Sequence, residues 1–135
     1  MPFALLDRWR APAPDPQVAG WLRTFSYAHR GLHGDGLAEN SRGAFAAAIA
    51  AGLGIECDVR RTIDERAVVF HDAALDRLTG QAGQIDQLGV GDVTRMTLTT
   101  GGETIPTLRD LLDQVAGTVP LLLELKTEQR RSVHR

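Results

Sequence analysis

Two carboxylates lie within a β-prone segment near the middle of the chain. Glu56 and Asp58 stand two residues apart in the run Ile55–Thr62, and a second β-prone run, Ala67–Phe70, follows a short polar turn. Because side chains alternate between the two faces of a strand, both carboxylates are expected on one face. Burial of two like charges is costly unless a cation or protons neutralise them. His71 closes the second run and can exchange protons near neutral pH, so the predicted hairpin is a candidate active site.

The rest of the chain alternates predicted strands and helices. Strands are expected at Thr24–His29 and at Val119–Leu125, and the second of these is a continuous apolar run that suits a strand buried on both faces. An alanine-rich helix is expected over residues 44–51 behind an N-cap at Asn40 or Ser41. This order predicts an α/β fold with parallel strands and right-handed crossovers.

Two further segments complete the pattern. A helix is expected from Leu108 to Val115, behind a capping box formed by Thr107 and Asp110. Residues 72–104 contain many glycines and are expected to be rich in loops, with short helical turns near residues 92–96.

Composition narrows the function classes. A chain of 135 residues is one domain at most, and a formal net charge of −2 gives no reason to expect a nucleic-acid partner. The single cysteine, Cys57, fits a reducing compartment and is expected to point away from the carboxylates as a small buried hydrophobe. No apolar run is long enough for a membrane span, so membrane insertion is not expected. A cytoplasmic location is expected instead.

Further polar residues stand at predicted strand ends and in the loops that follow them, where parallel α/β folds build their active sites. They are His29, Arg30, Glu39, Asn40, Glu124 and Lys126. Carboxylates from two strands suit a hard divalent ion such as Mg²⁺ or Ca²⁺, and two histidines suit general acid–base catalysis. Arg30 and Lys126 suit a phosphate. Without a further signal, solvated carboxylates and a structural histidine remain the alternative interpretation.

Eight short sequence words, in order and at matching spacing over residues 26–126, give that signal. The chain resembles the glycerophosphodiester phosphodiesterase family through His29-Arg-Gly31, Glu39-Asn-Ser41, Ala44-Phe45, Glu56-Cys-Asp-Val59, Val69-Phe-His-Asp72, Leu75-Asp-Arg-Leu-Thr79, Ile105-Pro-Thr-Leu108 and Glu124-Leu-Lys126. Ala38 stands where the family usually has proline, and Glu65 stands where it often has glycine. These differences are expected to affect loop stiffness or turn type.

The resemblance implies a TIM-barrel fold and hydrolysis of small-molecule glycerophosphodiesters to glycerol 3-phosphate and an alcohol. It implies that Glu56, Asp58 and Glu124 hold a divalent metal, Mg²⁺ or Ca²⁺, and that His29 and His71 carry protons. It further implies substrate binding by four residues, Arg30, Glu39, Asn40 and Lys126, and makes the glycerol hydroxyl of the substrate the expected nucleophile.

A complete (β/α)₈ barrel takes about 250 residues. The chain is therefore expected to form a partial barrel, with roughly the first three barrel strands and a hairpin insertion. The predicted parts are an N-terminal extension (residues 1–23), the N-terminal part of the barrel domain (24–126) and a polar basic tail (127–135), with a truncation or frameshift as one interpretation of that tail. The alternatives are an inactive barrel fragment that needs a partner chain, and a phosphodiesterase of the lysophospholipase D type. The oligomeric state stays open.

Overall fold

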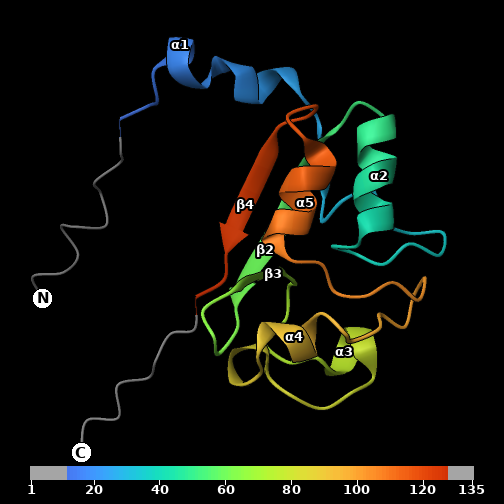
Figure 1. Cartoon of the computed structure of the whole chain (residues 1–135). Coiled ribbons are helices and arrows are strands. Elements are labelled where there is room, and N and C mark those ends of the chain that lie inside the picture. Colours follow the sequence, from blue (N-terminus) through green and yellow to red (C-terminus); the bar gives the residue numbers. More distant parts are fainter. Residues whose placement is uncertain (1–11, 128–135) are drawn as a thin grey trace, which may run out of the picture.

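The computed structural model describes residues 12–127 and shows helices packed on a small, mainly parallel sheet (Figure 1). The elements are α1 (Pro16–Ala19), η2 (Gly20–Thr24), β1 (Tyr27–His29), α2 (Arg42–Ala50), β2 (Gly54–Arg61), β3 (Ala67–Val69), α3 (Asp76–Thr79), η3 (Ile85–Gln87), α4 (Val90–Val93), α5 (Leu108–Val115) and β4 (Leu121–Leu125). None of the helices in the described part of the chain is long and apolar enough to cross a membrane.

Strand β2 is the centre of the sheet. It pairs in parallel with β1 and with β4, and its end pairs antiparallel with β3, so the predicted hairpin is confirmed. Val59 is opposite Val69 of β3 and opposite Leu125 of β4, which places β3 and β4 on different sides of β2. The parallel strands therefore run in the order β1-β2-β4, joined through α2 and α5, as the alternation of elements predicted.

Local sequence signals explain the two longer helices. Ser41 caps α2 and its hydroxyl accepts a hydrogen bond from the Ala44 N–H at 3.1 Å. Thr107 and Asp110 form the predicted capping box of α5, in which each side chain accepts a hydrogen bond from the other residue's backbone N–H. After α5 the chain turns through Ala116, which has a φ of +46°.

The main hydrophobic core lies between the sheet and these two helices. Its buried residues are Ala28, Phe45, Ala48, Ile55, Cys57, Val69, Leu111 and Val115. Because Ile55 and Cys57 of β2 belong to this core, the alternation of the strand directs Glu56 and Asp58 to the opposite face. The predicted burial of Cys57 is confirmed.

The segment between β3 and α5 has a core of its own. Short helices α3, η3 and α4 enclose a second cluster of buried residues, Ala38, Val68, Phe70, Leu75, Ile85, Val93, Leu98 and Ile105. The expectation of loops with helical turns near residues 92–96 identified a turn at about the position of α4. It did not include α3 or η3, because four- and three-residue turns carry little periodicity.

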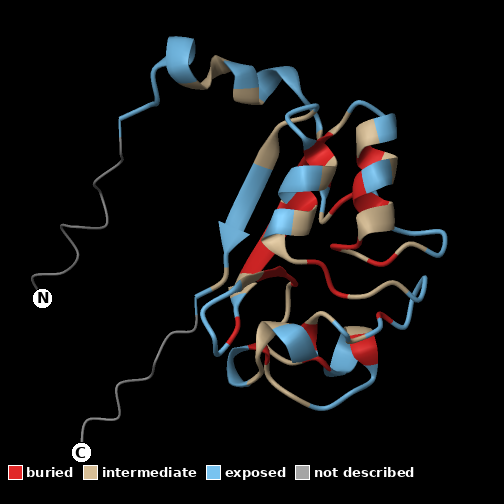
Figure 2. Ribbon diagram, viewed as in Figure 1, coloured by how far each residue is buried: buried red, intermediate tan, exposed pale blue. Residues whose placement is uncertain are grey.

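The prediction that the last strand is buried on both faces is wrong. Leu122, Leu123 and Leu125 of β4 are exposed, and Figure 2 shows most of this strand in pale blue. Among the described residues β4 pairs with β2 alone, which leaves its outer edge and much of its apolar surface uncovered. The apolar run itself was recognised correctly, but its burial depends on neighbours that a run of residues does not specify.

Residues 12–24 precede the sheet. The chain lacks regular structure over residues 12–15, as expected for a proline-rich spacer, but α1 and η2 then form two short helical turns that were not predicted. Pro16 takes the first position of α1 and the Asp15 side chain accepts a hydrogen bond from Gln17 N–H at 2.8 Å.

Candidate active site

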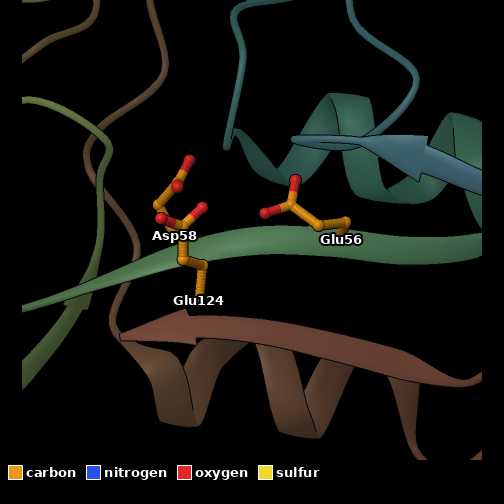
Figure 3. Close-up of side chains that lie close together, drawn as sticks. All are labelled: Glu56, Asp58 and Glu124. Carbon is orange, nitrogen blue, oxygen red and sulfur yellow. The ribbon is translucent and has the colours of Figure 1, made fainter. Parts of the chain in front are cut away.

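The three acidic residues of the candidate metal site converge. Asp58 and Glu124 are opposite one another in the register of β2 and β4, and Glu56 stands two residues earlier on the same face of β2. One carboxylate oxygen from each residue lies within 4.8 Å of the others. Figure 3 shows the three side chains on the same side of the two strands. The topology thus brings together Glu56 and Glu124, which are 68 residues apart in the sequence.

Asp58 is the buried member of this cluster, with an exposed fraction of 1%. Asn40 Nδ2 donates a hydrogen bond to Asp58 Oδ2 at 3.0 Å, and the Asp58 N–H donates to Asn40 Oδ1 at 3.4 Å. Two cations compensate the charge: Arg30 Nε lies 3.4 Å from Oδ2 and Lys126 Nζ lies 3.2 Å from Oδ1. A solvated strand face, the alternative left open by the sequence, does not describe this carboxylate.

Glu56 and Glu124 are less enclosed. Glu56 Oε2 accepts a hydrogen bond from the Arg30 backbone N–H at 3.1 Å and lies 3.9 Å from His29 Nε2. Exposed Glu124 accepts a hydrogen bond from Lys126 Nζ at 2.6 Å. This bond, together with Asp58, raises the pKa of the Lys126 ammonium above its usual value.

The donor set fits a hard divalent cation. All three groups offer carboxylate oxygens, which Mg²⁺ and Ca²⁺ prefer. Two oxygens on opposite sides of a Ca²⁺ ion are about 4.6–5.2 Å apart, since each Ca–O distance is about 2.3–2.6 Å. A maximum separation of 4.8 Å therefore allows one ion to contact Glu56, Asp58 and Glu124 together.

The backbone at the end of β1 positions the groups that compensate the acids. Arg30 and Asn40 both have left-handed backbone conformations, with φ of +58° and +54°, and the Asn40 N–H donates to the Arg30 carbonyl at 2.9 Å. Gly31 has a φ of +78°, and a Cβ at this position would lie 2.9 Å from Ala44 Cβ. The glycine after Arg30 is therefore required both by its backbone conformation and by contact with α2.

A hydrogen-bonded chain leads from His71 to Arg30. His71 Nδ1 lies 2.7 Å from Asp72 Oδ1, and Arg77 binds Asp72 through Nε at 2.7 Å. Arg77 also contacts Glu39 through Nη1 at 3.0 Å and Nη2 at 2.7 Å, and Glu39 accepts a further hydrogen bond from Arg30 Nη1 at 3.0 Å. The hydrogen bonds from Arg77 are the main cause that lowers the pKa of both Glu39 and Asp72 below its usual value.

Sequence reasoning assigned no role to Arg77 or Asp72. Asp72 ends the family word Val69-Phe-His-Asp72, and Arg77 is the middle residue of the next word, Leu75-Asp-Arg-Leu-Thr79. Membership in these words was the signal that could have identified both residues. Their importance depends on contact with Glu39, which is 38 residues away from Arg77. Neither strand nor helix periodicity reports such a contact.

The two histidines expected to carry protons occupy different positions. The side chain of His29 is 70% exposed and borders Glu56. His71 is partly buried, and its carbonyl oxygen accepts a hydrogen bond from Arg60 Nε at 2.7 Å. His71 follows Phe70, whose N–H donates to the Asp58 carbonyl at 3.0 Å, so β3 ties it to the strand that carries the acids.

Cys57 lies on the other face of β2. Burial, followed by the adjacent charges of Glu56 and Asp58, raises the pKa of its thiol to about 12. The thiol is therefore protonated at neutral pH and behaves as an apolar core group.

Comparisons with known proteins agree with the resemblance. The model of the glycerophosphoryl diester phosphodiesterase family matches residues 29–135. The chain is 45% identical over 86 residues to a probable glycerophosphodiester phosphodiesterase 2 of Mycobacterium tuberculosis, covering 63% of this chain and 32% of the relative. It is 34% identical over 116 residues to a glycerophosphodiester phosphodiesterase of Bacillus altitudinis, covering 81% of this chain and 46% of the relative.

Solved structures give the same result. A phosphodiesterase from Oleispira antarctica, in complex with the product sn-glycerol-3-phosphate, matches with a TM-score of 0.68 and 29% identity, covering 78% of this chain and 46% of that one. The chain thus spans less than half the length of these relatives. The match of the family model over most of the sequence, on residues that converge in the fold, shows that the chain belongs to the glycerophosphoryl diester phosphodiesterase family.

Proposed function

We propose that this chain carries the metal- and phosphate-binding part of an enzyme that hydrolyses glycerophosphodiesters to glycerol 3-phosphate and an alcohol. The observation that carries the proposal is the convergence of Glu56, Asp58 and Glu124 within 4.8 Å, beside the cations Arg30 and Lys126. The relative that holds sn-glycerol-3-phosphate as its product supports the substrate class. A cytoplasmic location belongs to the same proposal.

The described strands are proposed to be the first part of a TIM barrel. Three parallel strands in the order β1-β2-β4, with α2 and α5 on one face, are what the start of such a barrel requires. The polar cluster lies toward the carboxyl end of β4, where barrel enzymes place their active sites. The proposed division into an extension (1–23), a barrel part (24–126) and a tail (127–135) reaches into residues 1–11 and 128–135, outside the described part.

Glu56, Asp58 and Glu124 would hold the divalent metal, whose chemistry is Lewis-acid polarisation of a phosphoryl oxygen. Arg30 and Lys126 are proposed to bind the phosphate, with Glu39 and Asn40 as further substrate-binding residues. The position of Arg30 supports this assignment, because its guanidinium lies beside the acidic cluster, with Nε 3.4 Å from Asp58 Oδ2. Asn40 and Glu39 already orient this guanidinium and its partner Asp58 through the hydrogen bonds described above.

His29 and His71 are proposed to transfer protons. The ring of His29 lies 3.9 Å from Glu56, and the ring of His71 is linked to Arg30 by the hydrogen-bonded chain described above. One histidine would accept a proton from the attacking hydroxyl and the other would donate one to the leaving alcohol.

Metal binding directly tests whether the three acidic residues form a metal site. Titration calorimetry with Mg²⁺ and Ca²⁺ is expected to show binding by the wild type, weakened at least about 10-fold in Glu56→Gln, since a charged oxygen ligand is lost. Glu65→Gln in the exposed hairpin turn is the matched control and is expected to bind like the wild type. Equal affinity of Glu56→Gln and wild type for both ions would contradict the assigned site.

Turnover tests the reaction. Release of glycerol 3-phosphate from glycerophosphocholine is expected to need Mg²⁺ or Ca²⁺, to stop with a chelator and to be lost in His29→Ala. The exposed β4 edge favours one alternative, an inactive barrel part that needs a partner chain. Metal binding without turnover would support this alternative. Preference for lysophosphatidylcholine over glycerophosphocholine would instead support an activity of the lysophospholipase D type.

A further inference from the structure

Arg77 joins two segments of the site that are far apart in sequence. Its guanidinium contacts both oxygens of Asp72, through Nε at 2.7 Å and Nη2 at 2.9 Å. It also contacts both oxygens of Glu39, through Nη1 at 3.0 Å and Nη2 at 2.7 Å. One planar group thereby binds two carboxylates in the forked geometry that arginine allows and lysine does not.

These contacts have a consequence for His71. Asp72 is ionised near neutral pH, and an ionised carboxylate can only accept a hydrogen bond. The two hydrogen bonds from Arg77 fix the direction of its oxygens. In the contact of 2.7 Å between His71 Nδ1 and Asp72 Oδ1, the proton must therefore belong to Nδ1. The neutral ring then has Nε2 as its unprotonated, basic atom, which is the form required for a group that accepts a proton at Nε2.

We propose that Arg77 is a positioning residue, which holds Asp72 in place so that the neutral His71 ring keeps its proton on Nδ1 and offers Nε2 for proton transfer. The same guanidinium fixes Glu39, the partner of Arg30, so it sets the spacing between the proton-transfer side and the phosphate side of the site. The part of this inference that concerns catalysis rests on the proposed function, while the part that concerns the ring of His71 does not.

The plain alternative is a surface salt bridge without function, because the Arg77 side chain is 48% exposed and exposed pairs contribute little. Two observations favour positioning. Glu39 is only 11% exposed and Asp72 25%, so the carboxylates are more enclosed than the arginine. Four hydrogen bonds in fork geometry also restrict orientation, which a single flexible ion pair does not.

The ring of His71 is the decisive readout. Long-range ¹H–¹⁵N spectra of the labelled full chain, at a pH where the ring is neutral, report which ring nitrogen carries the proton, and His71→Gln assigns the signals. The wild type is expected to show the Nδ1–H form alone, and Arg77→Met a mixture of both forms. Arg95→Met, which removes an exposed arginine paired with Asp92, is the matched control and is expected to match the wild type.

Arg77→Lys separates charge from geometry. It keeps the positive charge but not the fork, so a partial shift toward the mixture is expected. It also serves as the deciding variant if circular dichroism shows that Arg77→Met does not fold. A ring that stays entirely in the Nδ1–H form in the folded variant, or a wild type with the proton on Nε2, would overturn the proposal.

Kinetics form a second and separate readout. With glycerophosphocholine as the substrate, Arg77→Met is expected to lower kcat about 10-fold, because the ring of His71 loses its fixed form. A smaller rise in KM is expected because Glu39 loses a partner. An unchanged kcat in an active enzyme would contradict the catalytic part. If the wild type shows no turnover, the proposed function fails, and the spectra of His71 still decide the role of Arg77.

Discussion

Asp58 illustrates how the fold accommodates a buried charge. Its carboxylate is almost fully enclosed, and an isolated charge in such a place would be very costly. Arg30, Lys126 and Asn40 together surround it with two positive charges and an amide donor. Removal of one partner leaves the others in an unbalanced site, which is why each of these residues is expected to affect more than its own contact.

Asp72 contributes to the acid sensitivity of the fold. Because its pKa is lowered in the folded state, first by Arg77, Asp72 stabilises the protein at a pH above its unfolded value of about 3.9, and this stabilisation is lost as the pH falls below that value. The amide side chain introduced by Asp72→Asn cannot ionise, so this variant lacks the stabilisation. Urea unfolding at about pH 6 and about pH 3 is therefore expected to show a stability difference between wild type and variant that shrinks at the lower pH.

Asp86→Asn, in the exposed turn η3, controls for the loss of a negative charge. It is expected to lack the pH-dependent difference shown by Asp72→Asn. A difference for Asp72→Asn that is equal at both pH values, or that grows with acid, would contradict the link between Arg77 and the stability of the folded state.

The sequence predicts the positions of some site residues but not of others. The alternation of β2 predicted that Glu56 and Asp58 share a face and that Cys57 does not, because strand geometry determines this locally. Position in the chain gave no indication of the Arg77 contacts, which join a loop after β1 to a helix after β3. Such contacts follow from how segments pack, not from the pattern of either segment.

Helix α5 places β4 beside β2, and its N-terminal capping box is the local signal that starts it. Thr107→Ala removes one member of the box and is expected to lower the free energy of unfolding by about 0.5–2 kcal/mol. Thermal or urea unfolding measures the loss. Thr100→Ala, in an exposed turn, is the control and is expected to change stability by less than about 0.5 kcal/mol. A loss for Thr107→Ala no larger than that of the control would argue against the box.

Elements with strong local signals were the predictable ones. Helices α2 and α5 have polar caps and apolar faces, and β2 has a β-prone run followed by a turn. The short elements α3 and η3 are stabilised mainly by the second core, where Leu75 and Ile85 are fully buried. Their formation depends on tertiary packing, which local propensity does not encode.

The two hydrophobic cores stabilise different parts of the fold. The first packs α2 and α5 against the sheet, and the second supports the segment that presents His71, Asp72 and Arg77. The candidate site lies where the two supported parts meet, on the face of β2 that is turned away from the helices. The sequence singled out His71 and the three acidic residues as candidates but not Asp72 or Arg77, and the distance between these groups depends on both cores at once.

The edge of β4 leads to a prediction about self-association. Leu125 is 69% exposed on a strand whose outer edge pairs with no other strand in residues 12–127. An apolar, unpaired edge favours pairing with another chain, and a charge on such an edge opposes it. The protein is therefore expected to associate as its concentration rises, and Leu125→Lys is expected to associate less, as measured by analytical ultracentrifugation over a dilution series. Ile63→Lys changes a similarly exposed residue, 64%, outside the strands and is expected to leave association unchanged. Equal association of both variants and the wild type would show that the β4 edge is not the surface through which copies of the chain meet.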